Sequence, residues 1–155
     1  MLPPELIVGR RIACRVEVTS KKRLLETLGE LLASASSILS PETVFERLVE
    51  RERLGSTGLG HGIALPHARM PEIKEPIGAF AQLTSGIDYD AIDGARVDLA
   101  FALLVPEAAN EMHLKLLSYL AGKFSDPVLR AQLRGATSPD EILALLDDPV
   151  PPGDA

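Results

Sequence analysis

The spacing of apolar residues predicts two helices in the first third of the chain. Residues 21–34 are expected to form the first, whose apolar face would be Leu24, Leu28, Leu31 and Leu32. Ser40 would cap the second helix, and Pro41 suits its first helical position. This helix should run to about residue 53, end before Gly55, and bury Val44, Phe45, Leu48 and Val49.

Short apolar runs predict the strands. Residues 14–18 alternate between apolar and polar, residues 63–65 end at Pro66, and residues 77–84 form a longer run. Residues 97–105 are nearly all apolar, which is typical of a central strand buried on both faces. Asp93-Gly94 indicates a tight turn before that strand. The glycine-rich residues 55–62 are predicted to be a loop.

Three further helices are predicted after the central strand. Asn110 would cap the first of them, with an inner face of Met112, Leu116, Leu117 and Leu120. Asp126-Pro127 would open the next, which Gly135 would close, and the capping box of residues 138–141 would open the last.

Helices flank the strands on both sides in the sequence. The predicted fold class is therefore α/β, with three layers and a mixed β-sheet flanked by helices on both faces. We expect one domain over residues 1–155, ordered from about residue 5 to residue 148. Residues 149–155 hold three prolines and are predicted to form a flexible tail.

Composition and charge exclude several classes of function. Of the 155 residues, 46% are hydrophobic and 25% charged, as in a folded globular domain. The net charge of −6 argues against a nucleic-acid partner, which needs a basic face. The single cysteine, Cys14, excludes an internal disulfide and is expected to be a small buried apolar residue. Without a signal peptide or a long apolar run, the chain is expected in the cytoplasm, with no membrane insertion.

Two of the three histidines are candidates for chemistry. His67 follows Pro66 at the end of a short apolar run, where sites of α/β sheets form, although it could be a loop histidine without a task. His113 lies in the first turn of a predicted helix, whose positive end should lower its pKa and would attract an anion. It could equally be a surface histidine.

Three arginines are further candidates for binding a phosphoryl group, and several motifs of other functions are absent from the sequence. Arg51, Arg53 and Arg69 could each grip a phosphoryl group with two hydrogen bonds, or be solvated surface charges. The sequence has no HxxxH or CxxC pair for a metal, no Walker A or GxGxxG loop for a nucleotide, and no GxSxG elbow for a hydrolase. We therefore expect neither a metal nor a cofactor.

The stretch RERLGSTGLGHGIALPHAR, residues 51–69, resembles the mannitol/fructose-type IIA domains of the phosphoenolpyruvate-dependent phosphotransferase system. Within that family it is most similar to the nitrogen-regulatory branch. The resemblance continues through residues 80–83, 92–94, 97–106 and 113–114, and covers about residues 14–146. It implies a mixed sheet with helices on both faces, as the apolar pattern also predicts.

The resemblance also implies roles for single residues. His67 matches the histidine that is phosphorylated at Nε2, His113 the second histidine, which hydrogen-bonds the phosphoryl group, and Arg51 the arginine that supports the site. His61 matches a variable position and receives no role. The implied phosphoryl donor is a phosphorylated HPr-like protein, and the chain would be a phosphotransferase component with a phosphohistidine intermediate.

Three functions remain open at this point. The first is a regulatory phosphocarrier, whose phosphorylation state acts on nitrogen- and potassium-related targets such as transporters or sensor kinases. The second is a sugar-specific IIA component that passes the phosphoryl group to a IIB protein. The third is a non-catalytic interaction module. Because this sequence shows no fused membrane or IIB domain, we expect the first.

Overall fold

The strands form one mixed sheet in the computed structural model, which describes residues 2–3, 5–108 and 110–147. They are β1 (Ile12–Val16), β2 (Gly58–Gly60), β3 (Ile63–Ala64), β4 (His67–Met70), β5 (Ile77–Ile87) and β6 (Val97–Pro106). The sheet order is β1-β5-β6-β3-β2, and β4 also pairs with β6. β1 is parallel to β5, β3 and β4 are parallel to β6, and the β5–β6 and β2–β3 pairs are antiparallel.

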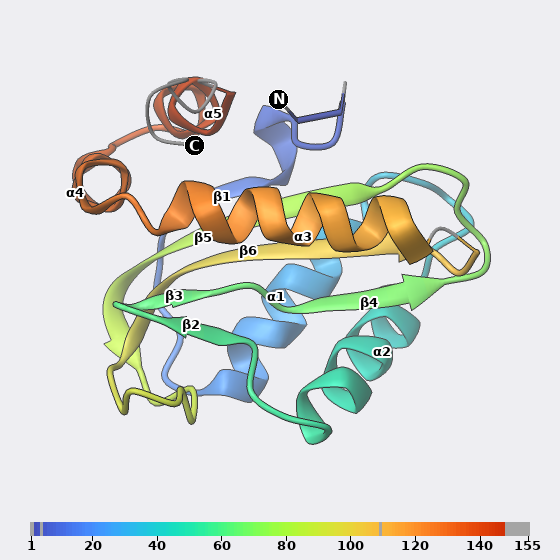
Figure 1. The fold of residues 1–155 in the computed structure, drawn as a ribbon, viewed down its shortest axis with the longest axis horizontal. Coiled ribbons are helices and arrows are strands. Elements are labelled where there is room, and N and C mark those ends of the chain that lie inside the picture. Colours follow the sequence, from blue (N-terminus) through green and yellow to red (C-terminus); the bar gives the residue numbers. More distant parts are fainter. Residues whose placement is uncertain (1, 4, 109, 148–155) are drawn as a thin grey trace.

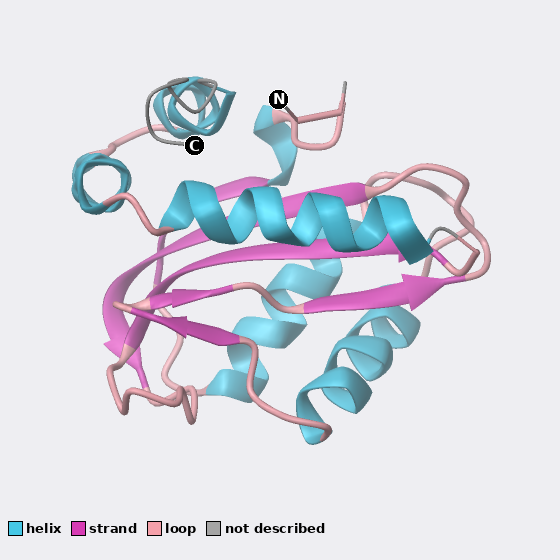
Figure 2. Ribbon diagram, viewed as in Figure 1, coloured by secondary structure: helices cyan, strands magenta, loops and turns pink. Residues whose placement is uncertain are grey.

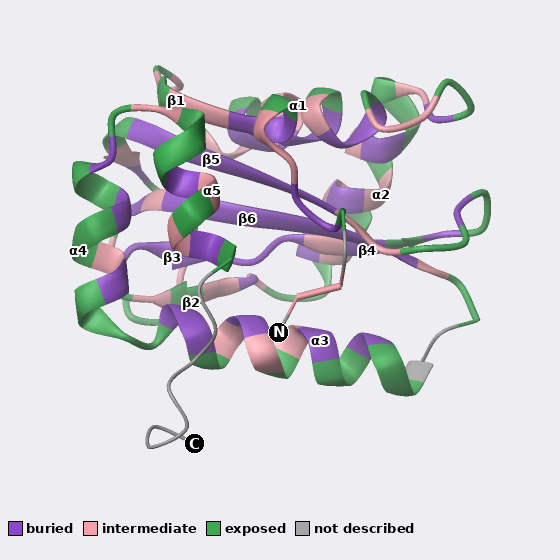
Figure 3. Cartoon of the chain, turned by 90° about the horizontal axis from the view of Figure 1, so that it is seen from above, coloured by how far each residue is buried: buried purple, intermediate pink, exposed green. Residues whose placement is uncertain are grey.

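Helices cover both faces of this sheet (Figures 1 and 2). They are α1 (Lys21–Ala33), α2 (Pro41–Arg53), α3 (Asn110–Phe124), α4 (Pro127–Gly135) and α5 (Pro139–Asp147), with a short 3₁₀ turn at Gly9–Arg11. Seen from above, α1 and α2 lie on one side of the strands and α3 lies on the other (Figure 3). Among the helices of the described residues, none combines the length and apolarity that a membrane crossing needs.

The alternation of side chains along β6 explains the three layers. Ala100, Ala102 and Leu104 belong to the core under α1 and α2. Leu99, Phe101, Leu103 and Val105 belong to the second core, together with residues of α3, α4 and α5. Because successive strand residues point to opposite faces, a strand that is apolar at every position has to be covered on both sides.

The structure confirms the predicted fold class and most of the helix boundaries. The side chains of Ser40, Asp126 and Ser138 each accept a hydrogen bond from a backbone N–H in the first turn of α2, α4 and α5. The third helix begins at Asn110, and the residue before it lies outside the described residues. The predicted flexible tail, residues 149–155, lies outside them as well.

Four predictions about strands need correction. The first strand begins at Ile12 and not at Cys14, and the strand that starts at Ile77 extends to Ile87. The predicted glycine-rich loop contains strand β2, and His67 begins strand β4, where no strand was predicted. Both short strands lack a strong apolar pattern. β4 gains its hydrogen bonds from the central strand β6, and β2 gains its own from β3.

Two burial predictions were also wrong. Met112 is 59% exposed, so it does not belong to the inner face of α3, which Leu116 and Leu120 form. Cys14 is half-buried and packs against the second core from the edge strand β1.

Candidate functional site

A hollow of about 320 Å³ lies beside the first residue of β4. It is lined by residues from α2, from the segment that leads into β3, from β4 and from α3. These are Arg51, Ser56, Thr57, Gly58, Leu59, Leu65, His67, Leu117, Ser118 and Ala121. The structure thus brings His67 and Arg51, two of the three predicted site residues, to one hollow.

The backbone of β4 directs His67 toward α3. Ala68 and Met70 belong to the core under α1 and α2, so His67, at the alternate position, points to the opposite face. Its Nδ1 lies 2.8 Å from the carbonyl oxygen of Leu65. A carbonyl can only accept, so Nδ1 carries the proton and the neutral ring has its lone pair on Nε2. The half-buried ring is therefore held in the tautomer whose free lone pair is on Nε2.

His113, the third predicted residue, contacts His67 directly. The two ring centroids are 5.7 Å apart, and the rings meet edge to face at 77°. Although His113 is only 8% exposed, its Nε2 has no hydrogen-bond partner within the described part of the chain. A buried polar nitrogen without a partner costs about 1–3 kcal/mol. This uncompensated nitrogen beside His67 is suited to a polar group that His67 would carry.

Both imidazoles are shifted toward the neutral form. Burial is the main cause that lowers the pKa of His67; the charge of Arg51 adds to this, and the hydrogen bond to Leu65 opposes it. Burial also lowers the pKa of His113, followed by the charges of His67 and Arg69. The pKa of His113 is lowered in the predicted direction, and burial is the main cause.

An NMR titration should give both histidines a pKa below that of a free histidine. We expect the ring ¹⁵N signals of His67 and His113 to titrate with midpoints below about 6.5, the ordinary value. The unfolded chain then binds more protons than the folded one between that value and the lower folded pKa. The free energy of unfolding should consequently fall as the pH drops through this window. Midpoints at or above the ordinary value would contradict the neutral assignment.

Arg51 is held at the edge of the hollow by the end of α2. It lies in the last turn of that helix, and its Nη1 donates to the carbonyl oxygen of Gly55 at 3.0 Å. None of the ion pairs found among the described residues includes Arg51. Its positive charge is therefore free to face an anion in the hollow. Arg53 and Arg69 are exposed and do not line the hollow, whereas Arg51 does.

A buried polar network behind the hollow was missed by sequence reasoning. We call Lys21, Glu52, Thr57 and Tyr89 the Glu52 network. The carboxylate of Glu52 accepts hydrogen bonds from the backbone N–H and the hydroxyl of Thr57, and it pairs with Lys21 at 2.9 Å. The hydroxyl groups of Thr57 and Tyr89 are 3.1 Å apart. Glu52 between two arginines was the only local signal, because Lys21 and Tyr89 are distant in sequence.

His61 lies outside this site. It is exposed in the turn between β2 and β3, where its φ of 57° is in the left-handed region. Its backbone N–H donates to Asp93 at 2.9 Å, which secures the turn against the β5–β6 connection. This contact is structural.

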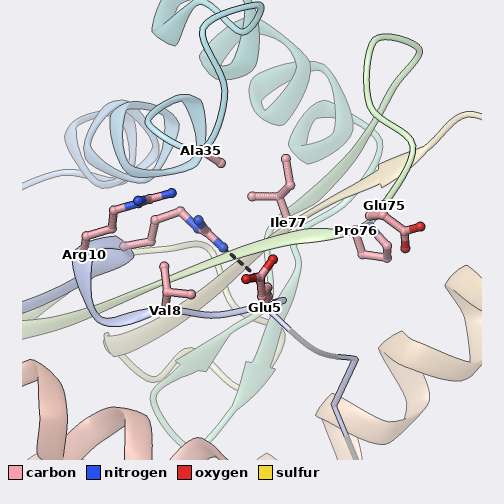
Figure 4. Close-up of a pocket in the computed structure, with 8 residues that line it drawn as sticks. Glu5, Val8, Arg10, Ala35, Glu75, Pro76 and Ile77 are labelled. Atoms are coloured by element: carbon pink, nitrogen blue, oxygen red, sulfur yellow. Dashed lines mark hydrogen bonds between the residues drawn. The ribbon is translucent and has the colours of Figure 1, made fainter.

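A larger hollow of about 580 Å³ lies at the start of β5 (Figure 4). Glu5, Arg10, Arg11 and Glu75 line it, so its charges are mixed and it contains no histidine. Arg11 is buried and donates to the carbonyl oxygens of Glu5, Leu6 and Gly78, which fixes the N-terminal segment to the sheet. We therefore place the candidate site at the smaller hollow. In the described part of the chain, no group of three or more His, Cys, Asp or Glu residues could hold a metal ion.

The fold resembles that of a solved structure, and the sequence shows the family. Over 90% of this chain and 98% of the other, the structure superposes on mannitol IIA from Escherichia coli with a TM-score of 0.76, at 23% identity. Residues 5–148 match the family described as phosphoenolpyruvate-dependent sugar phosphotransferase system, EIIA 2, and the chain belongs to this family.

Two relatives indicate the branch of the family. The chain is 42% identical over 144 residues to the nitrogen regulatory protein of Pseudomonas aeruginosa. The aligned region covers 93% of this chain and 94% of the relative. The crystal structure of nitrogen regulatory protein IIA-Ntr from Neisseria meningitidis has a TM-score of 0.87 and 48% identity, over 92% of this chain and 97% of that one. Both findings confirm the nitrogen-regulatory resemblance drawn from the sequence.

Proposed function

We propose that this chain accepts a phosphoryl group on Nε2 of His67 and regulates other proteins by its phosphorylation state. The observation that carries the proposal is the tautomer of His67. Its Nδ1–H is held by the carbonyl of Leu65, which leaves the lone pair on Nε2, beside the unpaired Nε2 of His113. Membership of the EIIA 2 family supports the same chemistry.

The transfer is a displacement at phosphorus. The lone pair on Nε2 of His67 forms the new N–P bond while the N–P bond to the donor's histidine breaks, and that ring nitrogen keeps the electron pair. The proton stays on Nδ1, which donates a hydrogen bond to the carbonyl oxygen of Leu65, so His67 does not lose a proton. The positive charge of Arg51 and a hydrogen bond from His113 would stabilise the phosphoryl oxygens, because positioning and charge account for most of such catalysis.

The proposed donor is a phosphorylated HPr-like protein that docks on the apolar residues around the hollow. Leu54 is 84% exposed, and Leu59, Met112 and Leu114 are also exposed although they are large and apolar. Leu59 lines the hollow, Leu54 follows Arg51 by three residues, and Met112 and Leu114 are the sequence neighbours of His113. Exposed apolar residues of this kind around a reactive group are typical of a protein–protein contact.

The nitrogen-regulatory relatives favour regulation over sugar transport. We accordingly propose that the targets are nitrogen- or potassium-related proteins, such as transporters or sensor kinases, in the cytoplasm. A sugar-specific IIA component would instead pass the phosphoryl group to a IIB protein, and the name of the family leaves this as the second candidate.

Phosphorylation in a reconstituted system tests the proposal. The protein is incubated with phosphoenolpyruvate, enzyme I and an HPr-type protein, and its intact mass and modified site are then determined. We expect an acid-labile gain of one phosphoryl group on His67. No gain, with phosphorylation of the donor verified, would overturn the proposal and favour a non-catalytic interaction module. Rapid transfer onward to a IIB protein would favour the sugar-transport function.

Replacing His113 with alanine should slow phosphoryl transfer without moving the phosphoryl group from His67. The variant removes the nitrogen that would hydrogen-bond the phosphoryl oxygens, a loss worth roughly 10²-fold to 10³-fold for a comparable oxyanion donor. The rate is measured by quenched-flow labelling at saturating phosphorylated donor. Transfer at the wild-type rate would count against a role for His113.

A further inference from the structure

We propose that Thr57, Glu52 and Lys21 position the phosphoacceptor site of His67, although none of them receives the phosphoryl group. This inference rests on the function proposed above. Glu52 is 9% exposed and Thr57 is 6% exposed, so both are buried, and Thr57 is the member of the Glu52 network that lines the hollow.

The hydrogen bonds of the network allow one arrangement of protons. Oε1 of Glu52 accepts from Nζ of Lys21 and from the backbone N–H of Thr57, and Oε2 accepts from the Thr57 hydroxyl. Since Thr57 gives its only hydroxyl proton to Glu52, the hydroxyl of Tyr89 must donate to Thr57. Burial raises the pKa of Tyr89, so this proton is retained. The donors and acceptors that the network buries are therefore paired with one another.

Backbone hydrogen bonds connect this network to the reactive ring. The carbonyl oxygen of Thr57 accepts from the N–H of Leu65 at 3.0 Å. The carbonyl oxygen of Leu65 in turn accepts from Nδ1 of His67 at 2.8 Å. A shift of Thr57 would thus move the group that fixes both the orientation and the tautomer of His67.

The same network fixes the position of Arg51 relative to His67. Glu52 is the next residue of α2 after Arg51, and its carboxylate binds Thr57, which lines the hollow. Lys21, the first residue of α1, pairs with Glu52 and lies 4.4 Å from the centroid of the Tyr89 ring. Its ammonium balances a carboxylate that would otherwise repel an incoming phosphoryl group. The network therefore sets both the geometry and the charge behind the hollow.

Thr57→Val tests the proposal because valine has nearly the shape of threonine without the hydroxyl. We expect the first-order rate of His67 labelling at saturating phosphorylated HPr-type protein to fall by about tenfold to a hundredfold. The donor concentration at half-saturation should stay unchanged, since the Thr57 side chain is buried and valine keeps its shape. Thr57→Ser retains the hydroxyl and should restore most of the rate.

Gln82→Met is the matched control for loss of buried hydrogen bonds. The Gln82 amide is buried and donates to the carbonyl oxygens of Leu133 and Ala136, at the end of α4. This variant should lose thermal stability and keep the wild-type rate of labelling. If it slows labelling as much as Thr57→Val does, the effect is one of general stability and the proposal is wrong.

The remaining outcomes also decide the proposal. A wild-type rate in folded Thr57→Val would overturn it. If Thr57→Val does not fold, Lys21→Met provides the test. Lys21 is only half-buried at the start of a helix, so its replacement should disturb the fold less. A wild-type rate of labelling in that variant would overturn the proposal as well. Failure of the wild-type protein itself to accept a phosphoryl group would refute the underlying function, and that result is seen before any variant is compared.

Discussion

His67→Ala is expected to abolish phosphoryl uptake and to leave the fold intact. Uptake is lost because Nε2 of His67 is the proposed nucleophile, and the variant has no other nitrogen in its place. The fold should persist because the ring is half-buried and, among the described residues, it hydrogen-bonds just the neighbouring carbonyl of Leu65. Labelling by phosphorylated HPr-type protein is measured by intact mass, and the fold by far-UV circular dichroism.

His61→Asn is the control for this experiment. His61 is exposed and has a φ of 57°, a conformation that asparagine tolerates well, so the turn should be preserved. The control should take up one phosphoryl group on His67 at the wild-type rate. Labelling of His67→Ala to the wild-type level would show that another residue accepts the phosphoryl group, and it would refute the assignment. Loss of labelling in His61→Asn would show that His67 is not the only histidine required.

The helices could be predicted because their signals are local. Ser40 and Pro41 are neighbours in sequence, and the hydroxyl of Ser40 accepts from the N–H of Thr43, three residues along the chain. The central strand was equally clear, since residues 97–105 are apolar at nearly every position. Such signals involve residues a few positions apart, where propensity and capping decide the structure.

The short strands could not be predicted because distant partners decide them. His67 is paired with Leu103, and Gly58 is paired with Ala64 across a glycine-rich turn. Nothing in residues 58–60 or 67–70 favours an extended strand by itself. These segments become strands because a neighbouring strand offers unpaired backbone groups, so tertiary context overrides their weak propensity.

The residues of the candidate site also fall into those with a local sequence signal and those without one. His67 and Arg51 were found from a contiguous stretch of sequence, and His113 from its place in a predicted helix. The network that holds them was missed because its members come together only in the folded chain. The Thr57 and Tyr89 hydroxyls, for example, meet across 32 positions of sequence. Residue types can nominate the reacting groups, whereas the groups that orient them depend on packing between elements.

The largest loss of stability is expected for Phe101→Ala. Phe101 is fully buried in β6, and its ring centroid lies 6.5 Å from that of Phe80 and 6.0 Å from that of Phe124. These three rings join the sheet to α3, the helix that carries His113. Removal of a buried phenylalanine ring costs about 3–5 kcal/mol in the free energy of unfolding. Since small domains are stable by about 5–15 kcal/mol, this loss is a large share of the free energy of unfolding.

Urea unfolding followed by far-UV circular dichroism measures this loss, because the chain has no tryptophan to report by fluorescence. Phe45→Ala is the matched control, since it removes the same ring from α2, where that ring is only half-buried. We expect the control to lose clearly less stability, because less apolar surface returns to water. Equal losses in the two variants would mean that the Phe80–Phe101–Phe124 cluster does not hold α3 on the sheet. If the cluster does hold it, Phe101→Ala should also slow labelling of His67, because His113 would no longer be fixed beside it.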